Sequence, residues 1–209
     1  EYLEIHGGGH ITVLGDVDIM RRARIGNTAN PATFTIHGNY TGPEELLVES
    51  GIFHVTGDVA ITNHRLRTAN GATMIIDGDY FSQNNWLQLQ SGSTVKIAGD
   101  VYQGNSSDDG IYIENGSRFE SGGDIFAWDE IRVHNGGTFS PGEGVHTMNI
   151  SFNPTNNERR FWFQTDAAGG ATFEWDVNGH AGLDNNAGDM VIISSSRNPG
   201  LEFENNDFW

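Results

Sequence analysis

The residues best placed to do chemistry are Asp and Asn side chains that follow a glycine at regular intervals. These dipeptides recur every 19 to 24 residues, at Gly15-Asp16, Gly38-Asn39, Gly57-Asp58, Gly78-Asp79, Gly99-Asp100 and Gly123-Asp124. Carboxylates gathered along one edge are ligands that Ca²⁺ prefers. The candidate ligands of Ca²⁺ or another hard cation are therefore Asp58, Asp79, Asp100 and Asp124. In the alternative, structural interpretation, each Asp accepts a hydrogen bond from a backbone N–H of its own turn.

Few other residues are arranged for catalysis. Asp108-Asp109 is the one evident pair of acids for a polysaccharide lyase or hydrolase, but neighbouring residues of a strand point to opposite faces. The eight His residues are scattered without the spacing of metal ligands. We therefore expect no enzyme and no required cofactor. Aromatic side chains that could stack on sugar rings are Trp86, Trp128, Trp162 and Trp209.

An internal repeat must position these side chains, because two markers run through the chain with one period. A second series stands in phase with the Gly-Asp dipeptides, at Ser50-Gly51, Asn70-Gly71, Ser91-Gly92, Asn115-Gly116 and Asn135-Gly136. Gly and Asn tolerate the positive φ of tight corners. We therefore expect both series to mark corners between short strands, with glycines present for their positive φ.

The apolar residues between the corners recur in three rows. The first row precedes the Gly-Asp corner and comprises Phe34, Phe53, Met74, Val95, Phe119 and Phe139. The second row follows that corner and comprises Val17, Tyr40, Val59, Tyr80, Val101 and Ile125. The third row comprises Leu46, Leu66, Leu87, Ile111 and Ile131. Three short strands per repeat, stacked about 4.8 Å from those of the next repeat, would bury all three rows.

The sequence therefore predicts an all-β fold, a single right-handed parallel β-helix with about three short strands in each coil of roughly 20–21 residues. Residues 1–140 carry the regular coils, and residues 141–209 are expected to form less regular coils or a cap of the same solenoid. Val101 and Ile111 are 10 residues apart, where Tyr80 and Leu87 are 7 apart. This difference places an insertion within residues 103–110.

Charge and composition exclude several classes of partner. The chain has a formal net charge of −17 at pH 7, with 11 Lys and Arg against 28 Asp and Glu. Nucleic acids and anionic membrane surfaces attract basic residues, so neither is an expected partner. No stretch approaches the about 20 apolar residues of a membrane span. The absence of Cys excludes a disulfide framework without fixing the compartment.

The C-terminal third carries a resemblance to a known family. Its segments are Gly137-Thr138-Phe139-Ser140-Pro141-Gly142, the run from Ala171 to Gly179, and Gly188-Asp189-Met190-Val191-Ile192. These segments resemble the β-helical passenger regions of bacterial autotransporters and related surface adhesins. The resemblance implies a β-helix exported to the extracellular space or the cell surface of a bacterium.

Together these observations favour a secreted or cell-surface structural or adhesive protein. Solenoid ends expose unpaired strand edges, which favours self-association into a homo-oligomer or an extracellular fibre. The expected partners are therefore further copies of the chain or glycans of a host or cell surface. Two alternatives stay open: a carbohydrate-binding module, and a polysaccharide lyase or hydrolase.

Overall fold

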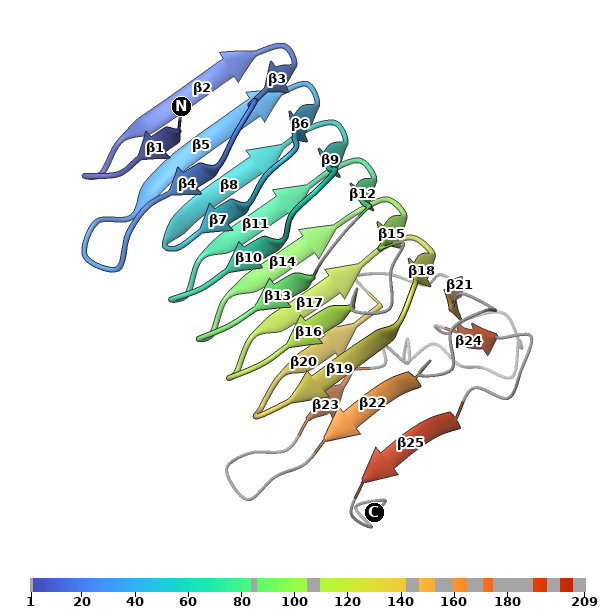
Figure 1. Ribbon diagram of the computed structural model, residues 1–209. Helices are drawn as coiled ribbons and strands as arrows, with labels where there is room; N and C mark the ends of the chain where they lie inside the picture. The colour runs from blue at the N-terminus through green and yellow to red at the C-terminus, as the bar shows by residue number, and fades with distance from the viewer. Residues whose placement is uncertain are drawn as a thin grey trace, which may run out of the picture.

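The computed structural model describes residues 2–83, 86–104, 110–141, 147–152, 160–164, 171–174, 190–194 and 200–204. This part of the chain forms strands and no helix. The strands pair in parallel and stack into three sheets, as coil follows coil along one axis (Figure 1). The predicted all-β parallel solenoid, with three strands in each coil, is confirmed.

Each coil contributes one strand to each sheet, and the strands are listed here in their order of stacking. Sheet A contains β1 (Leu3–Ile5), β4 (Ala23–Ile25), β7 (Leu46–Val48), β10 (Leu66–Thr68), β13 (Leu87–Leu89), β16 (Ile111–Ile113), β19 (Glu130–His134), β22 (Arg160–Gln164) and β25 (Gly200–Glu204). Sheet B contains β2 (His10–Leu14), β5 (Ala32–His37), β8 (Gly51–Val55), β11 (Thr73–Ile76), β14 (Thr94–Ile97), β17 (Arg118–Ser121), β20 (Thr138–Ser140) and β23 (Thr172–Phe173). Sheet C contains β3 (Val17–Asp18), β6 (Tyr40–Gly42), β9 (Val59–Ile61), β12 (Tyr80–Ser82), β15 (Val101–Gln103), β18 (Ile125–Ala127), β21 (Thr147–Phe152) and β24 (Met190–Ser194).

The register of the sheets follows the repeat. Leu66 pairs with Leu87 in sheet A, and Tyr80 pairs with Val101 in sheet C, so both pairs lie 21 residues apart. The members of all three predicted apolar rows pair with one another from coil to coil. Spacing in the sequence was sufficient to predict the register, because a slip of one residue would turn every apolar side chain outward.

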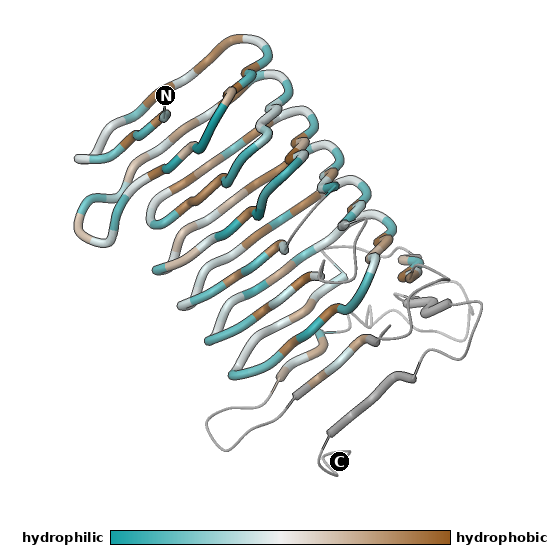
Figure 2. Tube along the Cα trace, viewed as in Figure 1, coloured by the Kyte–Doolittle hydropathy of each residue, from teal (hydrophilic) through white to brown (hydrophobic). Residues whose placement is uncertain are grey.

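The core is a continuous apolar column inside the three sheets. Inward and outward residues alternate along the strands, which Figure 2 shows as alternating hydropathy along the tube. Large aromatic side chains are fully buried, among them Phe53, Tyr80 and Phe119. Each coil alone could not bury its apolar row, so the coils stabilise one another by stacking.

The strands beyond residue 141 extend the same three sheets. Ile150 of β21 pairs with Ile125, and Phe161 of β22 pairs with Ile131. β22, which contains Phe161, Trp162 and Phe163, is thus a further strand of sheet A. The proposed division of the chain at residue 140 stays a prediction, and the insertion of residues 103–110 falls mainly on residues 105–109, outside the described residues.

The Asn-Gly corners lie between sheets A and B and are tight turns with left-handed backbone. At one of them φ is 51° for Asn70 and 71° for Gly71, and the Ala72 N–H donates to the Ala69 carbonyl at 2.9 Å. Two consecutive positive φ angles define a type I′ turn, which favours Asn-Gly. The prediction of positive φ is confirmed at these corners.

Candidate functional site

The predicted cation ligands lie in one row, along the corner between sheets B and C. In each coil the Oδ1 atom of the Asp or Asn accepts a hydrogen bond of 2.8 Å from the backbone N–H of the row residue in the next coil. The row comprises Asp16, Asn39, Asp58, Asp79, Asp100, Asp124 and Asn149. The structural interpretation, in which each Asp accepts an N–H of its own turn, is therefore wrong about the donor. The side chain points along the solenoid axis, so its Oδ1 accepts the backbone N–H at the corner of the next coil.

This ladder of hydrogen bonds explains the glycine before each row residue from Asn39 to Asp124. A Cβ atom on Gly78 would lie 2.3 Å from Asp58 Oδ1 and 2.7 Å from the backbone of Gly57. The row glycines from Gly38 to Gly123 are outside the left-handed region, so the positive φ expected from the sequence was wrong here. The glycine is needed because the carboxylate of the preceding coil packs directly against its Cα.

Asn149 is a row member that sequence reasoning missed. Its backbone N–H donates to Asp124 Oδ1 at 2.8 Å, and its Nδ2 lies 3.0 Å from both carboxylate oxygens. It follows Met148 rather than a glycine, in a longer coil, so neither marker of the repeat pointed to it. The amide holds both oxygens of the last carboxylate in the described row.

The geometry commits one oxygen of each candidate calcium ligand to the ladder. The Oδ2 atoms of these four residues are outside the backbone bonds, but that of Asp100 accepts the Tyr102 hydroxyl and that of Asp124 accepts the Asn149 side-chain amide. Among the residues that the structure describes, no group of three or more His, Asp and Glu side chains is placed to hold a metal ion. The calcium edge predicted from the sequence stays a prediction.

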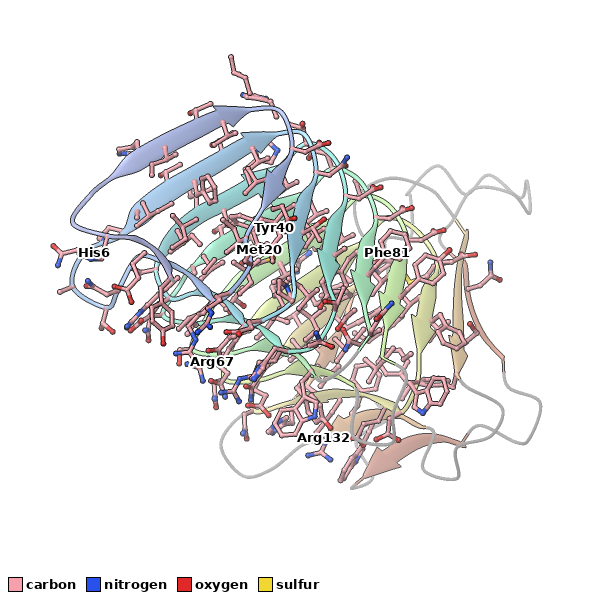
Figure 3. The ribbon with its side chains drawn as sticks, turned by 45° about the horizontal axis from the view of Figure 1, so that its top comes forward. His6, Met20, Tyr40, Arg67, Phe81 and Arg132 are labelled. Atoms are coloured by element: carbon pink, nitrogen blue, oxygen red, sulfur yellow. The ribbon has the colours of Figure 1, made fainter. Side chains whose placement is uncertain are left out.

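Exposed aromatic rings lie beside this row, on the outer face of sheet C. Phe81 of β12 and Tyr102 of β15 stack with their ring centroids 5.0 Å apart and their planes 3° from parallel. Both side chains are exposed, at 37% and 42%, and Figure 3 labels Phe81 on this face. Phe126 of β18 pairs with Tyr102 in the next coil. The face therefore carries three aromatic residues in consecutive coils.

A surface pocket of about 230 Å³ lies where this aromatic face meets the carboxylate row. Its lining residues are Asp100, Tyr102, Asp124, Ile125, Phe126, Asn149 and Ser151. The Tyr102 hydroxyl lies 3.3 Å from Asp100 Oδ2 and donates to it. The negative charge of Asp100 raises the pKa of the Tyr102 hydroxyl, and the charges of Asp79 and Asp124 add to the effect. The pocket is therefore lined by aromatic side chains and by negatively charged carboxylates.

The Trp residues predicted as sugar platforms are differently placed. Trp86 is half-buried and its ring packs 5.2 Å from that of Tyr112. Trp162 is half-buried beneath the Arg132 guanidinium, which lies 4.6 Å from its ring. Trp128 is also half-buried, and Trp209 lies outside the described residues, as does the acid pair Asp108-Asp109. Phe81 and Tyr102, by contrast, form an exposed aromatic stack.

The outer side of sheet A carries ion pairs instead of a pocket. Buried Glu45 accepts contacts from Arg22 at 3.0 Å and from Arg65 at 2.8 Å. Burial raises the pKa of the Glu45 carboxyl, but the Arg65 hydrogen bond and the charges of Arg22, Arg65 and Arg67 outweigh it, so the net pKa is lowered. Arg67 and Arg132 lie along this side of the solenoid in Figure 3. These pairs neutralise the carboxylates between coils and serve stability.

The first coil exposes apolar side chains at the N-terminal end of the solenoid. Within the described part, β1, β2 and β3 each have a neighbouring strand on one side only. Ile11 pairs with buried Phe34 yet is 39% exposed, because no coil among the described residues covers it. Leu14 and Met20 are 85% and 74% exposed. This end combines three unpaired strand edges with the uncovered end of the core.

The fold and its repeated corner define the class of protein: a parallel β-solenoid with coils stabilised by a side-chain-to-backbone ladder. Comparisons with protein-family models, with curated proteins and with solved structures found no match. No helix in the described residues has the length and apolar character to cross a membrane.

Proposed function

We propose that this chain is a structural or adhesive segment of an extracellular or cell-surface protein of bacterial origin, and that copies associate through their solenoid ends. The observation that carries this proposal is the exposure of Ile11, Leu14 and Met20 in the first coil, beside three strand edges that have no partner strand within the described residues. The resemblance of residues 137–192 to autotransporter passengers and surface adhesins supports the location. The proposal includes no catalytic step.

The physical argument concerns what each copy gains on association. An unpaired strand edge offers a row of N–H and C=O groups to another strand, and exposed apolar residues add a favourable transfer from water. The formal net charge of −17 opposes association, because like-charged copies repel one another. Salt screens that repulsion, so association is expected to strengthen as ionic strength rises.

Sedimentation velocity and negative-stain electron microscopy at several protein concentrations test the proposal. The wild-type chain is expected to form end-to-end oligomers or filaments, more readily at about 300 mM than at about 20 mM NaCl. Ile11→Lys places a charge in the uncovered end and is expected to abolish association. Ile52→Lys is the matched control, because Ile52 is 43% exposed on a strand in the middle of sheet B.

Three outcomes distinguish association through the solenoid ends from association through the sides and from no association. Loss of association in Ile11→Lys but not in Ile52→Lys supports assembly through the solenoid end. Equal loss in both variants would place the contact on the sides of the solenoid and contradict the proposal. A wild-type chain that stays monomeric at every concentration and salt would also contradict it, and would indicate that another segment or partner covers the first coil.

A further inference from the structure

We propose that the pocket beside Tyr102 and Phe126 binds a pyranose ring of a polysaccharide, either neutral or bearing an amino group. This site is distinct from the solenoid end and does not depend on self-association. Small-molecule sites combine a concave apolar surface with a few polar groups that fix orientation. The pocket has this combination, with two aromatic residues on one side and carboxylate, amide and hydroxyl groups on the other.

The aromatic stack leaves one ring face of Tyr102 open to a ligand. Phe81 stacks against one face of this ring, nearly parallel to it, so the opposite face looks toward the coil of Phe126. Although Phe126 pairs in register with Tyr102, the two rings make no stacking contact within the described part of the chain. The pocket lies beside both residues. The C–H face of a sugar ring fits this position because aromatic surfaces take up apolar groups of amphipathic molecules.

The polar groups of the pocket suit the hydroxyls of the same ring. Asp100 and Asp124 offer acceptors, and Ser151 and Asn149 offer a hydroxyl and an amide. Carboxylates that already accept protein hydrogen bonds stay fixed in place, which lowers the loss of side-chain entropy on binding. Here Asp100 Oδ1 accepts the Asp124 N–H at 2.8 Å, and Asp124 is held by the Asn149 amide at 3.0 Å.

Charge limits the class of sugar. No Lys or Arg lines the pocket, whereas two Asp residues do. A uronate would bring its own carboxylate toward these two and would be repelled. A neutral hexose avoids this repulsion, and the ammonium group of a hexosamine is attracted. The expected order of affinity is therefore glucosamine polymer, glucose polymer and, last, galacturonate polymer.

Isothermal titration calorimetry with three hexamers tests the site, using β-1,4-linked glucosamine, β-1,4-linked glucose and α-1,4-linked galacturonate. The wild-type chain is expected to bind the first two and not the third. Tyr102→Ala removes the open ring face and is expected to weaken binding about tenfold or more. Tyr102→Phe keeps the ring and is expected to stay within about threefold of wild type.

Two charge variants with the same chemistry test the pocket's location. Asp100→Asn keeps an Oδ1 acceptor for the Asp124 N–H, as Asn39 does naturally for Asp58 at 2.8 Å. It is expected to reduce the preference for glucosamine over glucose while the fold stays intact by circular dichroism. Asp58→Asn is the matched control in the same row, outside the pocket, and should keep wild-type affinities.

The proposal is overturned by any of three results. The first is that neither the glucose nor the glucosamine hexamer binds the folded wild-type chain. The second is unchanged affinity in Tyr102→Ala. The third is tighter binding of galacturonate than of glucose. None of these results bears on association through the solenoid end, which Ile11→Lys tests separately.

Discussion

Asp79 Oδ1 accepts a hydrogen bond of 2.8 Å from the backbone N–H of Asp100, which lies one coil further along the solenoid. The same bond recurs between consecutive row residues from Asp16 to Asn149. The side chain thus satisfies an N–H at a corner, between the hydrogen-bonded ladders of two sheets. From Gly38 to Gly123, the residue before each donor is a glycine whose added Cβ would meet the side-chain oxygen of the preceding coil, whereas Met148 stands at this place before Asn149.

This ladder predicts that the acceptor atom of Asp79 matters more than its charge. Asp79→Ala leaves the Asp100 N–H without its acceptor and is expected to lower the free energy of unfolding by about 2 kcal/mol. Asp79→Asn keeps an oxygen at Oδ1, as Asn39 does in its own coil, and is expected to cost less than about 1 kcal/mol. Urea unfolding followed by circular dichroism measures both. Equal losses in the two variants would contradict the ladder.

The glycine of the Gly-Asp corner is expected to resist substitution more than the glycine of the Asn-Gly corner. A Cβ on Gly78 would meet Asp58 Oδ1 at 2.3 Å, so Gly78→Ala is expected to cost about 3 kcal/mol through overpacking. A Cβ on Gly71 would meet no heavy atom within 4 Å, so Gly71→Ala is expected to cost only the about 1–2 kcal/mol of left-handed backbone. Chemical unfolding compares the two variants, and a smaller loss at Gly78 would refute the close approach.

Acid is expected to weaken the sheet A ion pairs at Glu45. Folding lowers the pKa of this carboxyl, so its contribution to stability is complete above the unfolded pKa of about 4.3 and is lost as the pH falls through the lower, folded pKa. Glu45→Gln leaves Arg22 and Arg65 without their carboxylate and is expected to cost about 2 kcal/mol at pH 7.

Thermal unfolding between about pH 2.5 and pH 7 checks this assignment, since the stabilisation by the carboxylate is complete above the unfolded pKa of about 4.3 and decreases below it. The gap in stability between wild type and Glu45→Gln should narrow as the pH falls below about 4. Glu4→Gln, at an exposed position, is the control and should follow the wild-type curve. A gap that stays constant through the acid range would show that the carboxyl's charge is not the source of the stability.

The calcium hypothesis for the Asp row predicts a rise in Tm with Ca²⁺ concentration, because a ligand that binds only the folded state stabilises it. Bound ions would have to use Oδ2 atoms, since each Oδ1 accepts an N–H. The variant with Asn at Asp58, Asp79 and Asp100 preserves those acceptors and should lose the rise. Differential scanning calorimetry in millimolar CaCl₂ or EDTA makes the comparison, and an unmoved wild-type Tm would reject the row as a calcium site.

The fold could be predicted from the sequence because the residue types that specify it recur at the same positions of every repeat. The apolar rows through Phe53, Tyr80 and Leu66 each recur at one place in the period, and the same residues pair in the three sheets. The Asn-Gly corners could also be predicted, since Asn and Gly tolerate the positive φ that Asn70 and Gly71 adopt. Because the pattern repeats, every pair of neighbouring coils supports the same alignment of the strands.

The site was less accessible because it depends on contacts between coils. The Trp residues singled out as sugar platforms include Trp86 and Trp162, which are half-buried, whereas Phe81 and Tyr102 form the exposed stack. Their spacing of one period was visible in the sequence. The inward row of Tyr80 and Val101 implies that Phe81 and Tyr102 point outward, but the stacking of their rings depends on side-chain orientation, which the spacing does not give.

The sequence by itself determined the period, the three strands of each coil, the buried rows and the acidic row, because each depends on residue type at a repeated position. The tertiary structure alone decided which N–H each carboxylate binds, why Gly78 must be glycine, and where Tyr102 and Asp100 meet to line a pocket. These are relations between neighbouring coils, and they follow from the direction in which a side chain leans along the axis, which a one-dimensional spacing does not contain.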